Sequence, residues 1–74
     1  MDNEMDYTVV IEGADDGSFS AYVPDLPGCV SCGDTPGQGL DSIQEAIKAH
    51  LERLRESGAA VPRPRSIASV VHAA

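Results

Sequence analysis

The feature that most constrains the fold is a single apolar stripe in the second half of the chain, over residues 40–54. Its members are separated by one, three or four positions, the spacing of one face of an amphipathic α-helix. They are Leu40, Ile43, Ala46, Ile47, Leu51 and Leu54. Thr35 and Pro36 form an N-cap and first-turn pair, and Gln38 completes a capping box. Because Gly58 is a natural C-terminal stop, the pattern predicts one helix whose apolar face must pack against another element.

Three short β-rich stretches precede this helix and predict an antiparallel meander. Residues 7–12 (YTVVIE) and 18–23 (SFSAYV) alternate, and the Gly, Asp and Ser residues between them fit a hairpin turn. Residues 29–33 (CVSCG) fit a third strand, and residues 66–73 (SIASVVHA) a last one. This last strand is expected to complete its own sheet or to exchange into a second subunit. The expected class is α+β, with order strand, strand, strand, helix, strand.

The connector between the second and third predicted strands, VPDLPG, is expected to be rigid. Neither proline can donate a ladder hydrogen bond, and each restricts the residue before it. A glycine after the second proline permits a turn that other residues adopt only with strain. The residues expected to set its shape are Pro24, Leu26, Pro27 and Gly28.

Two glycines fall in the first turn of the predicted helix, at Gly37 and Gly39. Each costs up to about 1 kcal/mol relative to alanine in a helix interior. We therefore expect the start of the helix to be less stable than its centre.

The chain is expected to form one domain over residues 1–74, with an N-terminal tail (1–6) and a Pro-rich connector (59–65) before the last strand. A chain of this length buries only about 60% of its unfolded surface, so a homo-dimer or tetramer, or another partner, is expected. No internal repeat or second domain fits within this length.

Charge restricts the partners. Twelve acidic against five basic residues give a net charge of −7, which repels nucleic acids and anionic lipids and favours a basic protein partner. The first residues, MDNEMD, are acidic where a signal peptide would be basic, and no apolar run approaches the roughly 18 residues of a membrane span. We therefore expect a cytoplasmic protein.

Cys29 and Cys32 have the C-x-x-C spacing of zinc and redox sites. Their odd separation places them on opposite faces of a regular strand, and zinc would need two further ligands from the distant His50 and His72. We expect neither a metal site nor a redox pair, but one cysteine packed against the helix and the other on the opposite face.

Catalysis is not expected either, and the chain gives no reason to expect a cofactor. Carboxylates that could hold magnesium lie mostly in predicted turns, where acidic residues are ordinarily found. They are Glu12, Asp15, Asp16, Asp25 and Asp34. A hydrolytic triad can be composed with the two histidines, but no nucleophile-elbow motif supports it.

Three longer stretches of the sequence are specific enough to indicate a family. The stretches YTVVIE, DGSFSAYVPDLPGCVSCGDT and SIQEAIKAHLERLRESGAAVPRP closely resemble the HicB family of antitoxins. The resemblance covers roughly residues 7–64 and is most specific in the VPDLPGC to GDT block, the EAI helix and the G-x-x-V-P-x-P exit. It implies a partial ribonuclease H-like fold that binds and blocks a small basic HicA-type RNA-cleaving toxin in a type II toxin-antitoxin system.

One departure limits what the resemblance implies. Many family members carry an additional operator-binding domain after the core, and we find none in this sequence. DNA binding and autorepression by this chain are therefore not expected.

Two functions remain open. The first is an antitoxin that occludes the active site of a HicA-like toxin, with Tyr22, Asp25 and Asp34 as candidate contacts because a tyrosine anchor and carboxylates suit an RNA-binding protein. In the alternative, these residues merely cover the sheet and cap turns. The second function is a solitary HicB-like domain without a toxin, acting as a structural oligomer or small-molecule binder.

Overall fold

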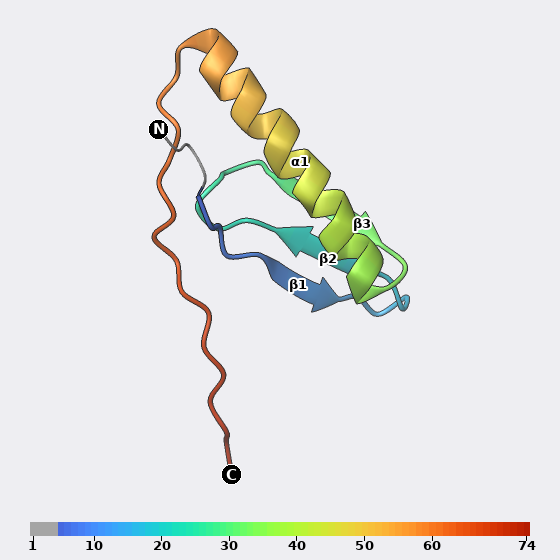
Figure 1. Ribbon diagram of the computed structural model, residues 1–74. Coiled ribbons are helices and arrows are strands. Elements are labelled where there is room, and N and C mark those ends of the chain that lie inside the picture. Colours follow the sequence, from blue (N-terminus) through green and yellow to red (C-terminus); the bar gives the residue numbers. More distant parts are fainter. Residues whose placement is uncertain (1–4) are drawn as a thin grey trace.

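The structure is a computed structural model that describes residues 5–74, so most of the expected N-terminal tail lies outside the described residues. Three strands precede one helix (Figure 1). They are β1 (Val10–Gly13), β2 (Phe19–Tyr22), β3 (Val30–Gly33) and α1 (Pro36–Ser57). The α+β class and the order of these elements are confirmed. No helix among the described residues is long and apolar enough to cross a membrane.

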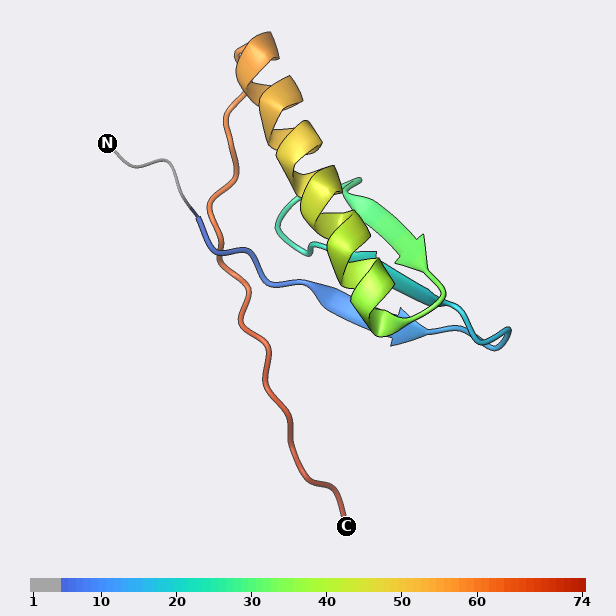
Figure 2. The same ribbon diagram turned by 45° about the vertical axis from the view of Figure 1, so that its right-hand side comes forward.

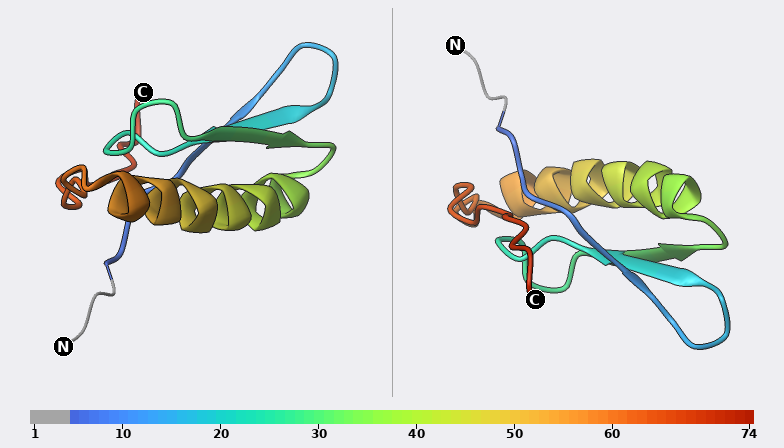
Figure 3. Two further views of the ribbon diagram at one scale, coloured as in Figure 1. Left: turned by 90° about the horizontal axis from the view of Figure 1, so that it is seen from above. Right: turned by 90° about the horizontal axis from the view of Figure 1, so that it is seen from below.

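The sheet is an antiparallel meander with strand order β1-β2-β3. Ala21 in the central strand pairs with Ile11 and Ser31, and this row faces α1. Since side chains alternate across a strand, the neighbouring row faces away from the helix. This outer row is Val10, Tyr22 and Val30. Figure 3 shows α1 covering one face of the sheet, so the domain has two layers.

The core is small and lies between α1 and the sheet. Its buried hydrophobic side chains are Ala21, Val23, Leu26, Cys29 and Ile43. Leu26 and Ile43 have no exposed surface, so the connector between β2 and β3, which carries Leu26, contributes directly to the core. Three hydrogen bonds fold this connector: Leu26 N–H donates to the Val23 carbonyl, Cys29 N–H to that of Leu26, and Val23 N–H to that of Cys29. Gly28 between them has φ of 84°, which favours glycine.

The helix begins at Pro36, as predicted, and its first turn is capped. The Thr35 hydroxyl accepts from Gln38 N–H at 3.1 Å, and the Gln38 side chain accepts from Asp34 N–H at 2.8 Å. The capping box thus closes onto the residue before Thr35 rather than onto Thr35 itself. At the other end Gly58 adopts φ of 78° and donates to the Arg55 carbonyl.

Close contact between the start of α1 and β3 depends on Gly33. A Cβ built at Gly33 would lie 2.6 Å from the Gly39 nitrogen and 2.8 Å from the Gln38 Cβ. Gly39 itself is buried, but a Cβ there would meet the Ala21 Cβ at an ordinary 4.0 Å. The first turn therefore packs directly on the strand that it follows.

After Gly58 the chain runs back past the sheet in an extended form (Figure 1). The Tyr7 hydroxyl donates to the Pro62 carbonyl, and the Thr8 hydroxyl donates to the Ser66 carbonyl at 2.7 Å. Asp25 accepts from the backbone N–H groups of residues 65 and 66 and from the Ser66 hydroxyl, at 2.8–2.9 Å. We call these hydrogen bonds the tail clamp, and residues 67–74 the tail segment.

The last strand expected at residues 66–73 is not formed within the chain, and this part of the prediction is wrong for the single chain. Among residues 5–74, no backbone hydrogen bond joins the segment after Ser66 to another element. Ile67, Val70 and Val71 are 91%, 97% and 82% exposed. The alternating pattern predicted an extended conformation, but the partner that a strand needs is absent from the chain's own sheet.

Candidate partner-binding surface

The outer row supplies an apolar strip on the sheet face that α1 leaves open. Tyr22 stands at its centre, half-buried between Val10 and Val30, and Val30 is 66% exposed. An aromatic side chain flanked by exposed aliphatic carbon is typical of the anchor positions of protein interfaces. The predicted contact Tyr22 therefore lies on a surface that a partner can reach.

Asp25, the second predicted contact, is engaged within the chain. Its carboxylate accepts three of the five hydrogen bonds of the tail clamp. The N–H groups of Arg65 and Ser66 lower the pKa of this carboxyl below its usual range, because they stabilise the charged form. In this structure the carboxylate holds the end of the Pro-rich connector against the loop between β2 and β3.

Asp34, the third predicted contact, lies far along the sheet from the other two. The pairing of Phe19 with Gly13 and Gly33 places the β1–β2 turn and the β3–α1 loop at the same end, whereas Tyr22 pairs at the opposite end. Asp34 is exposed in that loop. The structure thus does not bring the three predicted residues into one cluster.

Instead, Asp34 belongs to a group of exposed carboxylates at one end of the sheet, which we call the acidic end. Its members are Glu12, Asp15, Asp16 and Asp34. Asp16 accepts from the Ser18 hydroxyl at 2.6 Å and from its N–H at 3.0 Å, which lowers the pKa of the Asp16 carboxyl and closes the turn. The sequence held a signal for this surface that we did not use: residues 1–34 contain no Lys or Arg.

The basic residues occupy the other part of the chain. All five follow residue 47, on the second half of α1 and in the Pro-rich connector. They are Lys48, Arg53, Arg55, Arg63 and Arg65. The acidic end therefore carries a local negative charge that no Lys or Arg of the β-sheet half of the chain neutralises.

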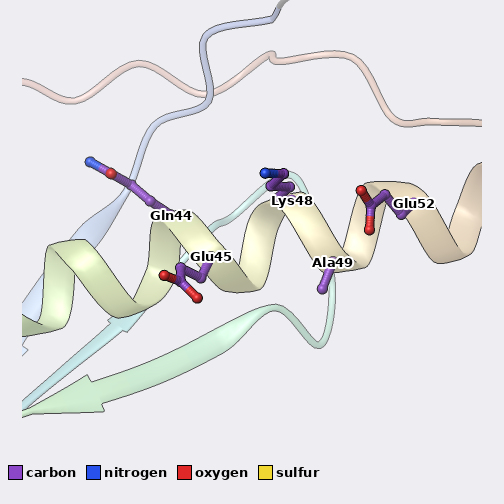
Figure 4. A pocket seen from close by; sticks show the side chains of 5 residues that line it. All are labelled: Gln44, Glu45, Lys48, Ala49 and Glu52. Carbon is purple, nitrogen blue, oxygen red and sulfur yellow. The ribbon is translucent and has the colours of Figure 1, made fainter.

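Three hollows lined by described residues of the chain do not form a ligand cleft. One of about 400 Å³ is lined by Gln44, Glu45, Lys48, Ala49 and Glu52, all from α1 (Figure 4). The side chains spread to different sides of the helix instead of converging. Two further hollows, of about 480 and 350 Å³, are also lined by α1 alone. A concave site with convergent polar groups, as small molecules require, is not built by these residues.

The two cysteines are separated as alternation predicts: Cys29 is buried in the core and Cys32 is exposed on the outer face. Burial raises the pKa of the Cys29 thiol, and the positive charge of Arg53 partly opposes this shift. Over residues 5–74, no group of three or more His, Cys, Asp or Glu side chains is placed to hold a metal ion.

Comparison with known proteins identifies the family. Residues 7–74 match the model of the HicB-like antitoxins of bacterial toxin-antitoxin systems. The chain belongs to this family. A UPF0150 protein of Thermoplasma acidophilum is 41% identical over 69 residues, which cover 93% of this chain and 100% of that protein. A UPF0150 protein of Synechocystis is 40% identical over 57 residues, covering 77% of this chain and 72% of that protein.

A longer relative shares the same core. An uncharacterised 14.9 kDa protein of Haemophilus phage HP1 is 35% identical over 68 residues, covering 92% of this chain and 50% of the phage protein. The HicB-like antitoxin described here thus spans about half the length of that relative and the full length of the Thermoplasma protein. The resemblance found in the sequence is confirmed, and the family match reaches beyond Pro64 into the tail segment.

Proposed function

We propose that this HicB-like antitoxin binds a small basic RNA-cleaving toxin of the HicA type and neutralises it by covering the active site. The antitoxin family supports a toxin as the partner. The observation that carries the finer proposal is the acidic end, where Glu12, Asp15, Asp16 and Asp34 are exposed on a chain of net charge −7.

The task of the proposed partner determines the charge of its surface. A protein that cleaves RNA must attract phosphates and therefore presents positive charge around its active site. A carboxylate-rich surface complements that charge, accelerates encounter and competes with the RNA for the same groups. The acidic end is the part of this antitoxin that suits the role.

The outer row supplies the apolar part of the proposed contact. Tyr22 and Val30 lie on the open sheet face, and carboxylates alone seldom give a long-lived complex. We propose Tyr22 and Asp34 as direct contacts, with Asp25 acting through the tail clamp. The protein acts in the cytoplasm as a homo-dimer or tetramer, without catalysing a reaction or binding nucleic acid directly.

The test uses the basic product of a neighbouring reading frame as the toxin probe. We expect the two proteins to co-purify and the antitoxin to stop RNA cleavage by that product. The triple variant Glu12→Gln, Asp15→Asn, Asp34→Asn removes charge from the acidic end without touching the capping role of Asp16. It should lower the association rate at least about tenfold and flatten its salt dependence.

The matched control removes the same charge from the exposed face of α1, through Glu45→Gln, Glu52→Gln and Glu56→Gln. This control should leave the association rate within about threefold, because its carboxylates lie nearer to basic residues. Equal losses in the two triple variants would contradict a localised site. Absence of any complex with the wild-type protein would contradict the toxin-binding proposal as a whole.

A structural oligomer without a toxin is the second candidate, and the exposed tail segment favours it. Ile67, Val70 and Val71 are available for association without another kind of protein. The small-molecule version has less support, because the hollows described above are each lined by one helix. A genome neighbourhood with no small basic reading frame, together with a stable homo-oligomer, would favour the structural role.

A further inference from the structure

We infer that the tail segment of one copy adds as a strand to the free edge of β1 in a second copy. Two such exchanges, related by a two-fold axis, make a symmetric dimer. The inference concerns self-association and does not depend on toxin binding.

The tail segment has the chemistry of a strand that lacks its partner. Ile67, Val70 and Val71 are almost fully exposed, and residues 66–74 contain no Lys, Arg, Asp, Glu or Pro. Charged residues and prolines are what ordinarily protect an exposed strand from pairing with another chain. An apolar, alternating and unprotected segment of this kind is therefore suited to add to a sheet edge.

The shape of the chain also indicates an unpaired segment. Its radius of gyration is 13.8 Å and its longest extent is 44 Å. A compact chain of this length has a radius of gyration of about 11 Å. Figures 1 and 2 show the tail segment leaving the two-layer body in both views, which lengthens the molecule.

The receiving edge is incompletely covered. β1 is an edge strand, and α1 packs chiefly against β3 and least against β1. As a result Tyr7, Val9 and Ile11, which face the helix side of the sheet, remain only half-buried. A strand added beside β1 would pair the free backbone groups of that edge and bury more of these side chains under its own apolar row.

The tail clamp favours a second copy over the chain's own sheet. Asp25 and Thr8 hold residues 65 and 66, and the next residues leave the sheet instead of turning along it. Residues 67–73, when extended, span about 23 Å, more than the four residues of β1 require. Because the same clamp exists in each copy, two tails can leave in opposite directions and each can reach the other's β1 edge.

The size of the core gives a reason for the exchange. The five buried hydrophobic residues form a small core for a free-standing domain. Because side chains alternate across a strand, each exchanged tail would place Ile67 and Val71 on one face of the sheet and Val70 on the other, and the aliphatic side chains on the helix side would leave water. Dimerisation would therefore enlarge the core beside β1, the strand that α1 covers least.

The test measures mass and amide exchange on the full chain. Light scattering should give a dimer at high concentration. Hydrogen exchange of residues 67–73 should slow at least about tenfold above the dissociation constant and be fast below it, because pairing depends on the second copy.

Proline variants identify the strand that mediates the contact. Successive N–H groups of a strand point to opposite sides, so either residue 70 or residue 71 must donate to the β1 edge. Of Val70→Pro and Val71→Pro, at least one should weaken dimerisation about tenfold or more, whereas Val70→Thr and Val71→Thr, which keep the N–H and the β-branch, should weaken it less.

Three results would overturn the inference. A monomer at every concentration would exclude the exchange of tail strands between copies. Slow amide hydrogen exchange at residues 67–73 in the monomer would show that the tail segment pairs with the sheet of its own chain. A dimer unaffected by either proline would place the interface elsewhere.

Discussion

The two ends of α1 are attached to the sheet by different physical means. At the N-terminal end, the first turn lies so close to β3 that a Cβ at Gly33 would come within 2.6 Å of the Gly39 backbone. Beyond the C-terminal end, the returning chain is held by the hydrogen bonds of the tail clamp, at partly exposed positions. Steric contact between backbones admits little adjustment, whereas exposed hydrogen bonds compete with water. The first attachment should therefore determine global stability and the second local order.

The largest effect is expected from Gly33→Ala. The new methyl group would meet backbone atoms of α1, which cannot move aside without shifting the helix, so we expect a loss of about 3 kcal/mol in unfolding free energy. Urea denaturation followed by circular dichroism measures it.

Gly37→Ala is the matched control for Gly33→Ala. The nearest atom to a Cβ at Gly37, the Thr35 hydroxyl oxygen, is 3.9 Å away, so alanine should stabilise the helix by up to about 1 kcal/mol. Equal stability of the two variants would show that the close approach does not constrain the fold.

A smaller effect is expected at the helix cap. Thr35→Ala removes the hydroxyl that accepts from Gln38 N–H and should cost about 1 kcal/mol. Thr35→Ser retains the hydroxyl and should lose much less. Thermal unfolding of the two variants makes the comparison, and equal losses would indicate that the methyl group of Thr35 is what matters.

The same contrast explains how far the sequence could predict the fold. The limits of α1 were predictable because Thr35, Pro36 and Gly58 act on their immediate neighbours. The contact at Gly33 was not, since its glycine requirement comes from the packing of one element on another. We counted Gly37 and Gly39 as weaknesses of the helix start, yet that turn is capped and packed against β3.

The candidate surface was predictable only in part. Tyr22 lies on the face opposite Phe19, as the alternation of residues 18–23 predicts, because strand alternation is local. The tail clamp joins Asp25 to Arg65 and Ser66, which follow it by 40 and 41 positions in the sequence. No local pattern indicates such a pairing. The predicted strand at 66–73 was wrong within the single chain for a related reason: alternation describes a segment's preference but not its partner.

At the tail clamp, a local effect is expected from Asp25→Asn. The amide keeps one acceptor oxygen, but it lacks the negative charge that strengthens the bonds from the N–H groups of residues 65 and 66 to Oδ2, and an NH2 group replaces one of the two acceptor oxygens, of which Oδ1 accepts from the Ser66 hydroxyl. Amide exchange at these two residues should rise at least about tenfold, with little change in the urea midpoint. Asp15→Asn, in the exposed β1–β2 turn, is the control. Global unfolding by Asp25→Asn would contradict the division between the two attachments.

The smallest effect is expected from acid. The pKa of Asp25 is lowered in the folded chain by the N–H groups of Arg65 and Ser66, so its contribution to order is complete above the ordinary aspartate pKa of 3.8 and is lost as pH falls through the folded value. Amide exchange at residues 65 and 66, corrected for its intrinsic pH dependence, should show increasing opening below about pH 4 while the helix persists. In Asp25→Asn this opening should no longer depend on pH, because the titrating group is gone. Asp16 also has a lowered pKa and should loosen the β1–β2 turn in the same range, so loss of pH dependence at residues 65 and 66 alone separates the clamp from the turn. An unchanged pH dependence in Asp25→Asn would show that another group controls the tail.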